Sequence, residues 1–424
     1  METSSVTQAQ CTAPSGGGSS LAPAPAPAAR GIPCRATPQP PSVRPVTIPF
    51  SDLKERGKDL SGKIGEGLGP HGLGIISIAD VPAFAELRKK LLRLAPRVAG
   101  LPDDVKKELE NPDSRYGVGW SHGKQKLESG KFDTFKGSYF ANPIFDIPTT
   151  DDVLVTRYPS FCRPNIWPTN HLPEFEIAFK DLGKLMFEVG LMLAHHCDRY
   201  VMLQGVGSYD GESLEQIIAR SRSHKGRLLY YFPRQFSKHK EDGESISSWC
   251  GWHTDYGSLT GLTCGLFMRN SMEITCPDSG AGLYIRTRDN QVVKVILEDD
   301  ELAYQIGETA EILSRGHLCA TPHCVQAPHG ENASDVARST FALFMQPDCE
   351  GEAGMYCAIT RERIEYLLLV QRSLNFQSLA INLDEKLKIP SEIPYHQELI
   401  PPNVMLTFGE YSERIVSKYY EAGT

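Results

Sequence analysis

Hydrophobic residues follow two different periods in two parts of this sequence. Between Pro173 and about Tyr200, apolar side chains recur at the three- and four-residue spacing that lines one face of a helix. Such a stripe predicts a long helix that packs against a core. Proline is favoured in the first helical turn, so Pro173 marks the expected start.

From Arg227 onward the pattern changes to short apolar runs separated by glycine, proline and asparagine. Short strands with regular turn signals are typical of an all-β barrel or a double-sheet jelly roll. We therefore expect a mainly β fold with added helices, in which a jelly-roll core is flanked by N- and C-terminal helices. The expected strands are 228–232, 259–267, 282–286, 292–297, 303–307, 317–325 and 340–345, and the closing helices are 360–380 and 408–421.

The segment before the core predicts a mixed α/β arrangement. A short strand is expected at 46–50 and an apolar strand at 74–78, with a helical region between them and a helix at 82–96. Residues 111–145 combine glycine and aromatic residues with few apolar repeats, which indicates a long loop or an irregular sheet edge.

The first 45 residues differ in composition from the rest, being rich in alanine, proline, serine and glycine. Such a segment buries too little apolar surface to offset its ordering entropy, so we expect disorder. Its arginines and hydroxyl residues, with Glu2 as the only acid before Asp52, fit an organelle transit peptide as well as a plain tail. The expected divisions are 1–45, 46–220, 221–350 and 351–424, in a cytoplasmic protein or one imported into a plastid or other organelle.

Charge and cysteine content narrow the range of partners. A net charge of -8, without basic clusters interleaved with aromatics, argues against a nucleic-acid partner. No apolar run has the length of a membrane span. Eleven cysteines without a CxxC pair are typical of a reducing compartment. We expect a small-molecule substrate and a monomer or weak oligomer.

The most informative short motif is His253-Thr254-Asp255, one of five His-x-Asp/Glu pairs in the chain. Residues i and i+2 of a strand share a face, and this pair runs into the apolar, strand-like residues from Leu259, so we expect His253 and Asp255 to share one strand face and bind one ion. The pair at His196 lies in a helical pattern, where its members diverge by roughly 200°. The pairs that start at His239, His329 and His396 lie in polar or proline-containing stretches.

Further motifs follow in a characteristic order. Residues 253–260 read HTDYGSLT, 282–283 read GL and 305–308 read QIGE, followed by His323 and by RST at 338–340. In this order the chain resembles the plant-type Fe(II)/2-oxoglutarate-dependent dioxygenases, the superfamily that includes isopenicillin N synthase. The resemblance spans about 46–420 in layout and is specific between 227 and 347.

The resemblance implies a metal site and a cosubstrate site. His253, Asp255 and His323 would bind Fe(II) as two histidines and one carboxylate, leaving positions for 2-oxoglutarate and O2. Arg338 would pair bidentately with the far carboxylate of 2-oxoglutarate, and Thr340 on the same strand face would donate a hydroxyl. Tyr231, in the RLLYY run at 227–231, would contact the cosubstrate. The implied reaction hydroxylates or desaturates a small organic metabolite and releases succinate and CO2.

Several features depart from the family pattern and leave the function open. The spacing from Asp255 to His323 is long, with the excess expected at 269–281, and Leu229 replaces a polar residue. An iron oxidase that does not use 2-oxoglutarate, as isopenicillin N synthase does not, would keep a similar residue set. A non-catalytic jelly-roll binding module and a zinc hydrolase also fit the metal ligands, although the hydrolase gives Arg338 no role.

Overall fold

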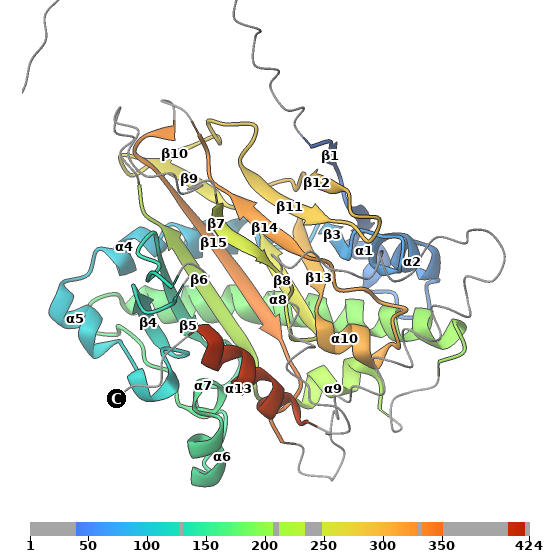
Figure 1. The fold of residues 1–424 in the computed structure, drawn as a ribbon, viewed down its shortest axis with the longest axis horizontal. Coiled ribbons are helices and arrows are strands. Elements are labelled where there is room, and N and C mark those ends of the chain that lie inside the picture. The colour runs from blue at the N-terminus through green and yellow to red at the C-terminus, as the bar shows by residue number, and fades with distance from the viewer. Residues whose placement is uncertain are drawn as a thin grey trace, which may run out of the picture. The chain divides into compact units, whose positions relative to one another are not determined.

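Two β-sheets packed face to face form the core of the protein, as the ribbon in Figure 1 shows. The computed structural model describes residues 40–126, 130–206, 212–233, 248–329, 333–350 and 406–419, which belong to one unit that begins at Pro40. The large sheet has the strand order β2 (Val46–Pro49), β3 (Ile75–Ala79), β13 (Leu302–Ile306), β8 (Leu259–Thr263), β15 (Val336–Met345), β6 (Lys225–Tyr231), β5 (Lys136–Ala141) and β4 (Gly119–His122). The small sheet has the order β1 (Ser42–Val43), β12 (Val292–Val295), β11 (Gly282–Arg286), β14 (His323–Gln326) and β7 (Ser248–His253).

The alternation of side chains along each strand separates two apolar layers. On β3, Ile76 and Ile78 belong to the core under the helices, whereas Ile75 packs with Ile285 and Val293 of the small sheet. Neighbouring residues of a strand point to opposite faces, so one strand serves both layers. The large sheet is therefore covered by helices on one face and by the small sheet on the other.

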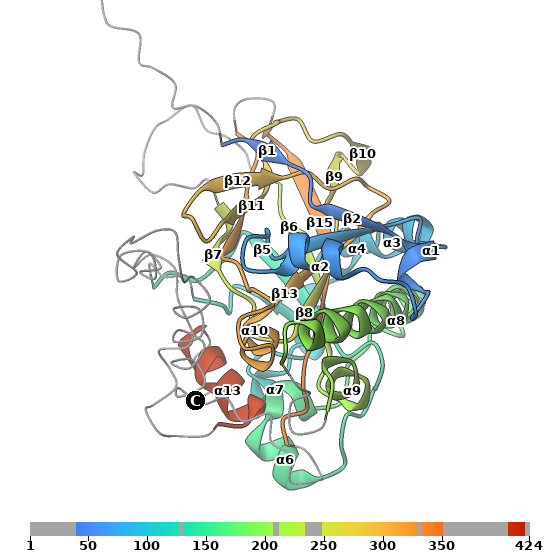
Figure 2. The same ribbon diagram turned by 90° about the vertical axis from the view of Figure 1, so that its right-hand side faces the viewer.

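Helix α8 (Pro173–Leu203) is the long helix that the apolar stripe predicts, and it begins at Pro173 as expected. Phe179 meets Phe341 of β15 edge to face, with ring centroids 5.0 Å apart. Figure 2 shows α2 and α8 on the side of the large sheet away from β7 and β11. The other helices are α1 (Phe50–Leu53), α2 (Ser61–Leu68), α3 (Phe84–Leu92), α4 (Ala95–Ala99), α5 (Asp103–Glu108), η1 (Pro112–Ser114), α6 (Asp152–Arg157), α7 (Pro159–Cys162), α9 (Leu214–Arg220), α10 (Glu308–Leu313) and α13 (Phe408–Tyr419).

Three predicted elements are wrong in their bounds. The helix expected at 82–96 is two helices, α3 and α4, because Pro96 has no N–H for the carbonyl four residues earlier. The run 259–267 is divided into β8 and β9 (Leu266–Arg269), since the Arg88 side chain binds the carbonyls of Cys264 and Gly265 between them. The run 317–325 becomes a strand only from His323, directly after Pro322.

The predicted start of order at Val46 is also late by several residues. β1 pairs in parallel with β12, and Ile296 N–H donates to the Val43 carbonyl. These bonds use only the backbone, so a composition poor in large apolar residues does not prevent them. The rest of the expected tail, 1–39, lies outside the described residues, as does the expected helix at 360–380.

The stretch 111–145 forms the edge of the large sheet through β4 and β5, which agrees with the expected irregular sheet edge. The long segment between β8 and β11 contains a hairpin of β9 and β10 (Met272–Ile274), close to the expected excess at 269–281. α13 matches the helix expected at 408–421 within the residues described there.

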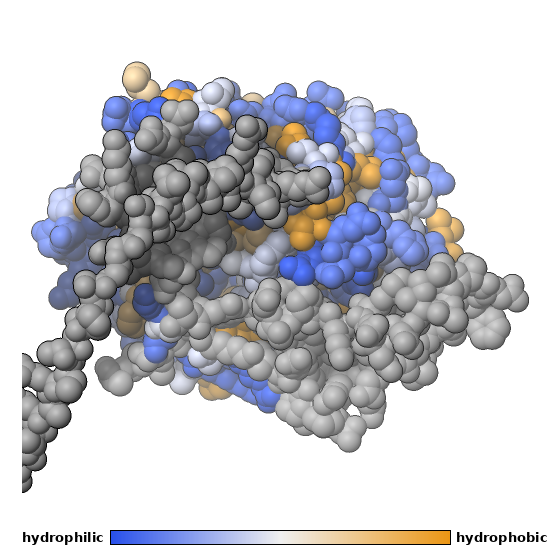
Figure 3. All heavy atoms as spheres, turned by 45° about the horizontal axis from the view of Figure 1, so that its top comes forward, coloured by the Kyte–Doolittle hydropathy of each residue, from blue (hydrophilic) through white to orange (hydrophobic). Residues whose placement is uncertain are grey.

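Figure 3 shows a face on which polar residues dominate the described surface, with apolar residues in patches between them. Among the described helices, none combines the length and the apolar character that crossing a lipid bilayer requires.

Candidate metal centre and cosubstrate site

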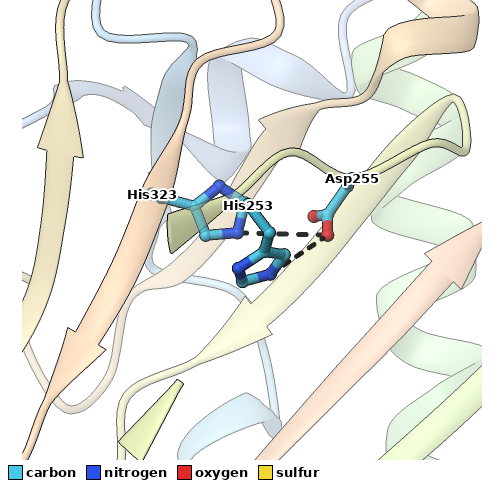
Figure 4. Close-up of side chains that lie close together, drawn as sticks. All are labelled: His253, Asp255 and His323. Carbon is cyan, nitrogen blue, oxygen red and sulfur yellow. Dashed lines mark ion pairs between the residues drawn. The ribbon is translucent and has the colours of Figure 1, made fainter. Parts of the chain in front are cut away.

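Three predicted ligands converge where the small sheet meets the loop after β7. One ligand atom from each of His253, Asp255 and His323 lies within 4.8 Å of the others. Asp255 Oδ1 is 3.8 Å from His253 Nε2 and 3.9 Å from His323 Nε2, as drawn in Figure 4. A single divalent ion at their centre fits this spacing, because metal-ligand bonds of about 2 Å place ligand atoms roughly 3 Å apart or more.

The two histidines are cross-strand partners, whereas the aspartate is not on a strand. His323 of β14 lies opposite His253 at the end of β7, and their ring centroids are 4.3 Å apart. The expectation that His253 and Asp255 share one strand face is therefore wrong. Glu308 N–H donates to the Asp255 carbonyl at 2.7 Å, drawing this backbone away from the β7 ladder toward α10.

Backbone carbonyls orient both imidazoles. The Nδ1 atom of His253 lies 2.8 Å from the Gly251 carbonyl, and that of His323 lies 3.1 Å from the Thr321 carbonyl. Each carbonyl can only accept, so Nδ1 carries a proton in both rings and Nε2 is the nitrogen that faces a metal. The described residues thus fit a metal of the two-histidine, one-carboxylate class.

The electrostatics of the two imidazoles differ. Burial, reinforced by the neighbouring His253, lowers the pKa of His323 to about 4, which keeps its ring neutral and able to bind metal. For His253, burial favours the neutral ring, but the charge of the Cys250 thiolate, the hydrogen bond to it and the charge of Asp255 outweigh burial and raise the pKa to about 9. Metal binding must therefore displace a proton from His253.

A buried carboxylate, Glu308, holds the loop that carries Asp255. Its oxygens accept hydrogen bonds from the hydroxyls of Thr254 and Tyr411, and all three side chains are buried. Tyr411 belongs to α13, so this contact joins the C-terminal helix to the metal loop. Sequence reasoning did not identify this role of Glu308, which stands out only as part of QIGE. The one available signal is an acidic residue at the start of a helix that follows a buried strand.

The loop and α10 also approach each other closely. A Cβ added to Gly307 would lie 2.1 Å from the Gly257 carbonyl oxygen, so only glycine allows this packing. Gly307 N–H donates to the Ser258 carbonyl, and Thr309 N–H to that of Gly257. Backbone contacts with the start of α10 thus fix the loop that carries Asp255.

Arg338 lies on the large sheet in an aromatic setting. Its side chain is only 9% exposed, and its guanidinium carbon is 5.3 Å from the Tyr231 ring centre and 5.5 Å from that of Trp249. Its Nη1 atom is buried and has no hydrogen-bond partner among the described residues. An unpaired buried guanidinium is costly, and a planar carboxylate would satisfy it.

Tyr231 and Trp249 form a stacked pair beside this arginine, with ring centroids 4.9 Å apart. Tyr231 was a predicted site residue and Trp249 was not. Burial raises the pKa of Tyr231 to about 12, so its hydroxyl stays protonated. Gly265 closes the other side, where a Cβ would lie 2.3 Å from Arg338 Nε.

Several proteins of known structure resemble this chain in fold. No known protein-family profile and no curated protein matches the sequence. Full-length T7H from Neurospora crassa, in complex with alpha-KG, superposes with a TM-score of 0.57 at 17% identity, covering 88% of this chain and 95% of that chain. A putative 2OG-Fe(II) oxygenase family protein from Caulobacter crescentus gives 0.53 at 18% identity, covering 78% and 99%. JOX2 in complex with 2OG, Fe and JA gives 0.50 at 16% identity, covering 76% and 82%.

The chain has the fold of the 2-oxoglutarate–Fe(II) oxygenases. The predicted jelly-roll class is thereby confirmed, and the family resemblance is confirmed at the level of the fold. The narrower plant-type assignment stays a prediction.

Within this oxygenase fold, Thr340 lies on the expected strand face, but its hydroxyl already has a partner. It is on β15 opposite Leu229 and shares a face with Arg338, but its hydroxyl donates to the Thr263 carbonyl at 3.0 Å. The donor expected for the cosubstrate is therefore already engaged inside the sheet. Leu229 packs with Tyr231 and Trp249, so this side of the oxygenase fold is apolar.

The histidine pair at His196 and the cysteines that flank His323 have structural roles in this fold. His196 Nε2 bonds the Leu53 carbonyl, and Asp198 accepts from the backbone N–H groups of Leu214 and Glu215 at the start of α9. Cys319 and Cys324, on either side of His323, are buried, and burial raises the pKa of both thiols to about 12. Of the pairs starting at His239, His329 and His396, only His329 lies within the described residues.

Proposed function

We propose that this chain is an Fe(II)- and 2-oxoglutarate-dependent dioxygenase that hydroxylates or desaturates a small organic molecule, releasing succinate and CO2. One observation carries the proposal. The fold combines the convergent His253, Asp255 and His323 with a buried arginine, Arg338, whose Nη1 atom lacks a partner among the described residues.

Each group has a defined task in this proposal. His253, Asp255 and His323 hold the iron, which when bound supplies open coordination positions for a 2-oxo acid and dioxygen. Arg338 binds the far carboxylate of 2-oxoglutarate, and the rings of Tyr231 and Trp249 hold the guanidinium and exclude water from it.

Structures of similar fold support a small-molecule substrate. T7H has been crystallised with alpha-KG and thymine, and with alpha-KG and 5-formyluracil. JOX2 has been crystallised with 2OG, Fe and JA. We extend only the class of ligand to this chain, not the ligands themselves.

Arg338 also separates this function from the competing functions that the sequence allows. A zinc hydrolase has no use for a buried arginine whose Nη1 atom lacks a partner in the described part of the chain, and a non-catalytic module has no need of three convergent ligands. An oxidase that does not consume 2-oxoglutarate would retain the same geometry. Only the ratio of succinate formed to oxygen consumed distinguishes it from a dioxygenase.

The test uses iron-loaded protein and labelled 2-oxoglutarate under air. Succinate should form in proportion to oxygen consumed, and its absence from fully iron-loaded, folded protein contradicts the proposal. Incubating the anaerobic iron and 2-oxoglutarate complex with a metabolite extract, followed by mass spectrometry of retained compounds, then identifies the molecule that is oxidised.

A further inference from the structure

The face of the large sheet that carries Arg338 continues across β6, β5 and β4, where polar side chains lie beyond the apolar Leu229. Arg338 lies opposite Tyr231, which lies opposite Lys136, so these three side chains form one row. Residues directly opposite in antiparallel strands point to the same face. The row therefore extends from the proposed 2-oxoglutarate site to the edge of the sheet.

Arg227 points to this same face. It precedes Tyr231 by four residues on β6, and side chains alternate along a strand. The intervening Leu228 packs in the core under the helices, and Leu229 packs with Tyr231 and Trp249 between the sheets. Arg227 thus faces the space between the sheets, roughly 13 Å along the strand from Tyr231.

The far end of this surface is a small hollow lined by buried polar side chains. Lys136, Asp133, Ser138 and Ser121 are all at least nine-tenths buried. They line the hollow together with Gly123, Lys124 and Gln125. Lys136 lies opposite Tyr231 on the neighbouring strand, so the hollow is adjacent to the proposed cosubstrate site.

The two lysines that line this hollow have carboxylate partners, whereas Arg227, which contacts the lining residues Ser138 and Gln125, does not have one among the described residues. Lys136 forms an ion pair with Asp133, and Lys124 forms one with Glu110 at 3.0 Å. Arg227 instead donates to neutral oxygens: its Nε and Nη2 atoms lie 3.0 and 2.9 Å from Ser138 Oγ, and Nη2 lies 3.4 Å from Gln125 Oε1. No carboxylate within the described ranges pairs with its guanidinium.

The bonds of Arg227 hold it in place and leave donors available. Its guanidinium carbon is 5.0 Å from the Phe140 ring centre, which fixes the plane of the group. Nε and Nη2 make all the hydrogen bonds found for this side chain in the described part of the protein, so the N–H groups of Nη1 remain for a ligand. A half-buried cation without a counter-charge favours binding of an anion.

We propose that Arg227 recognises an acidic group, a carboxylate or a phosphate, on the molecule that is oxidised. This inference rests on the proposed dioxygenase function and assigns its substrate class. Arg338 serves one anion, 2-oxoglutarate, and Arg227 serves a second, so that the substrate lies along the face of the large sheet that carries both arginines.

The test measures binding of matched small probes to the anaerobic protein saturated with iron and 2-oxoglutarate, which occupies Arg338. Calorimetry compares phenylacetate and phenyl phosphate with the neutral phenylacetamide. At least one acid should bind roughly tenfold or more tighter than the amide, as expected for a charge-assisted hydrogen bond. The better of the two acids identifies the group.

Two variants assign the preference to Arg227. Arg227→Gln should remove the difference between acid and amide, and Arg227→Lys should retain part of it. Arg97→Gln is the control, because Arg97 is on α4, where it forms an ion pair with Glu174 at 2.5 Å. If the wild-type protein shows no preference for either acid, or if Arg227→Gln keeps the preference, the inference is wrong.

The same samples separate this inference from the proposed function. Failure of the wild-type protein to bind 2-oxoglutarate or to form succinate contradicts the dioxygenase proposal itself. Normal 2-oxoglutarate binding and succinate formation without an acid preference contradict only the role of Arg227.

Discussion

The two sheets contribute to the site in different ways. The small sheet supplies His253 and His323 as a cross-strand pair, and backbone hydrogen bonds set the orientation of both rings. The large sheet supplies Arg338 and Arg227, which are held by aromatic rings or neutral side chains. The metal centre is thus fixed by the backbone, whereas the anion sites depend on side chains that can be exchanged without moving a strand.

The largest effect is expected at the metal centre. His253→Ala or Asp255→Ala should abolish stoichiometric iron binding and turnover, because two ligands cannot hold the ion in an open site. Iron per folded protein, measured by elemental analysis, and succinate formation test this expectation. His196→Ala is the matched control, since it also removes a histidine of a His-x-Asp pair but should cost stability only. Full activity in either ligand variant contradicts the triad.

Loss of Glu308 should affect both stability and iron. Glu308→Ala leaves the buried hydroxyls of Thr254 and Tyr411 without this acceptor, at about 1–3 kcal/mol each. Iron affinity should fall by roughly 10- to 100-fold, as when partners of metal ligands are removed. Thermal unfolding of the apo-protein and iron titration give the two quantities. Tyr411→Phe keeps the ring and should show a smaller loss of both; unchanged iron affinity in Glu308→Ala would rule out a positioning role.

Arg338 should affect the cosubstrate and not the metal. Arg338→Ala should raise the KM for 2-oxoglutarate by about tenfold or more, because a charge-assisted pair is lost, and should leave iron affinity unchanged. Steady-state kinetics with 2-oxobutanoate, which lacks the far carboxylate, is the chemical control. The wild-type preference for 2-oxoglutarate over 2-oxobutanoate should disappear in the variant; if the preference persists, another residue binds that carboxylate.

The smallest effect is expected from the aromatic rings beside Arg338. Trp249→Leu removes one of the two rings beside Arg338, and cation–π contacts contribute about 0.5–2 kcal/mol. The KM for 2-oxoglutarate should therefore rise by a few-fold with iron affinity unchanged. Trp167→Leu removes a comparable ring, beside Lys180 and outside the site, and should leave this KM unchanged. Equal effects of the two variants would show that packing alone is responsible.

Sequence reasoning identifies the features of the protein that depend on local sequence patterns. The helical stripe predicts α8, short apolar runs predict most strands of the core, and motif order identifies the residues that the structure brings together at the metal centre. It cannot place Trp249, because its contacts with Tyr231 and Arg338 join three strands that are distant in sequence. The role proposed for Arg227 likewise depends on the strand register, which cannot be read from the local sequence pattern.

The contacts of Glu308 have a consequence for folding. Its hydrogen bonds to Thr254 and Tyr411 join residues separated by 54 and 103 positions along the chain. Contacts between distant residues carry a large loop-closure entropy, so they form after local structure does. The metal ligands are synthesised before α13, and the loop that carries Asp255 gains its final support only when that helix docks. Iron capture should therefore be among the last events in maturation of the chain.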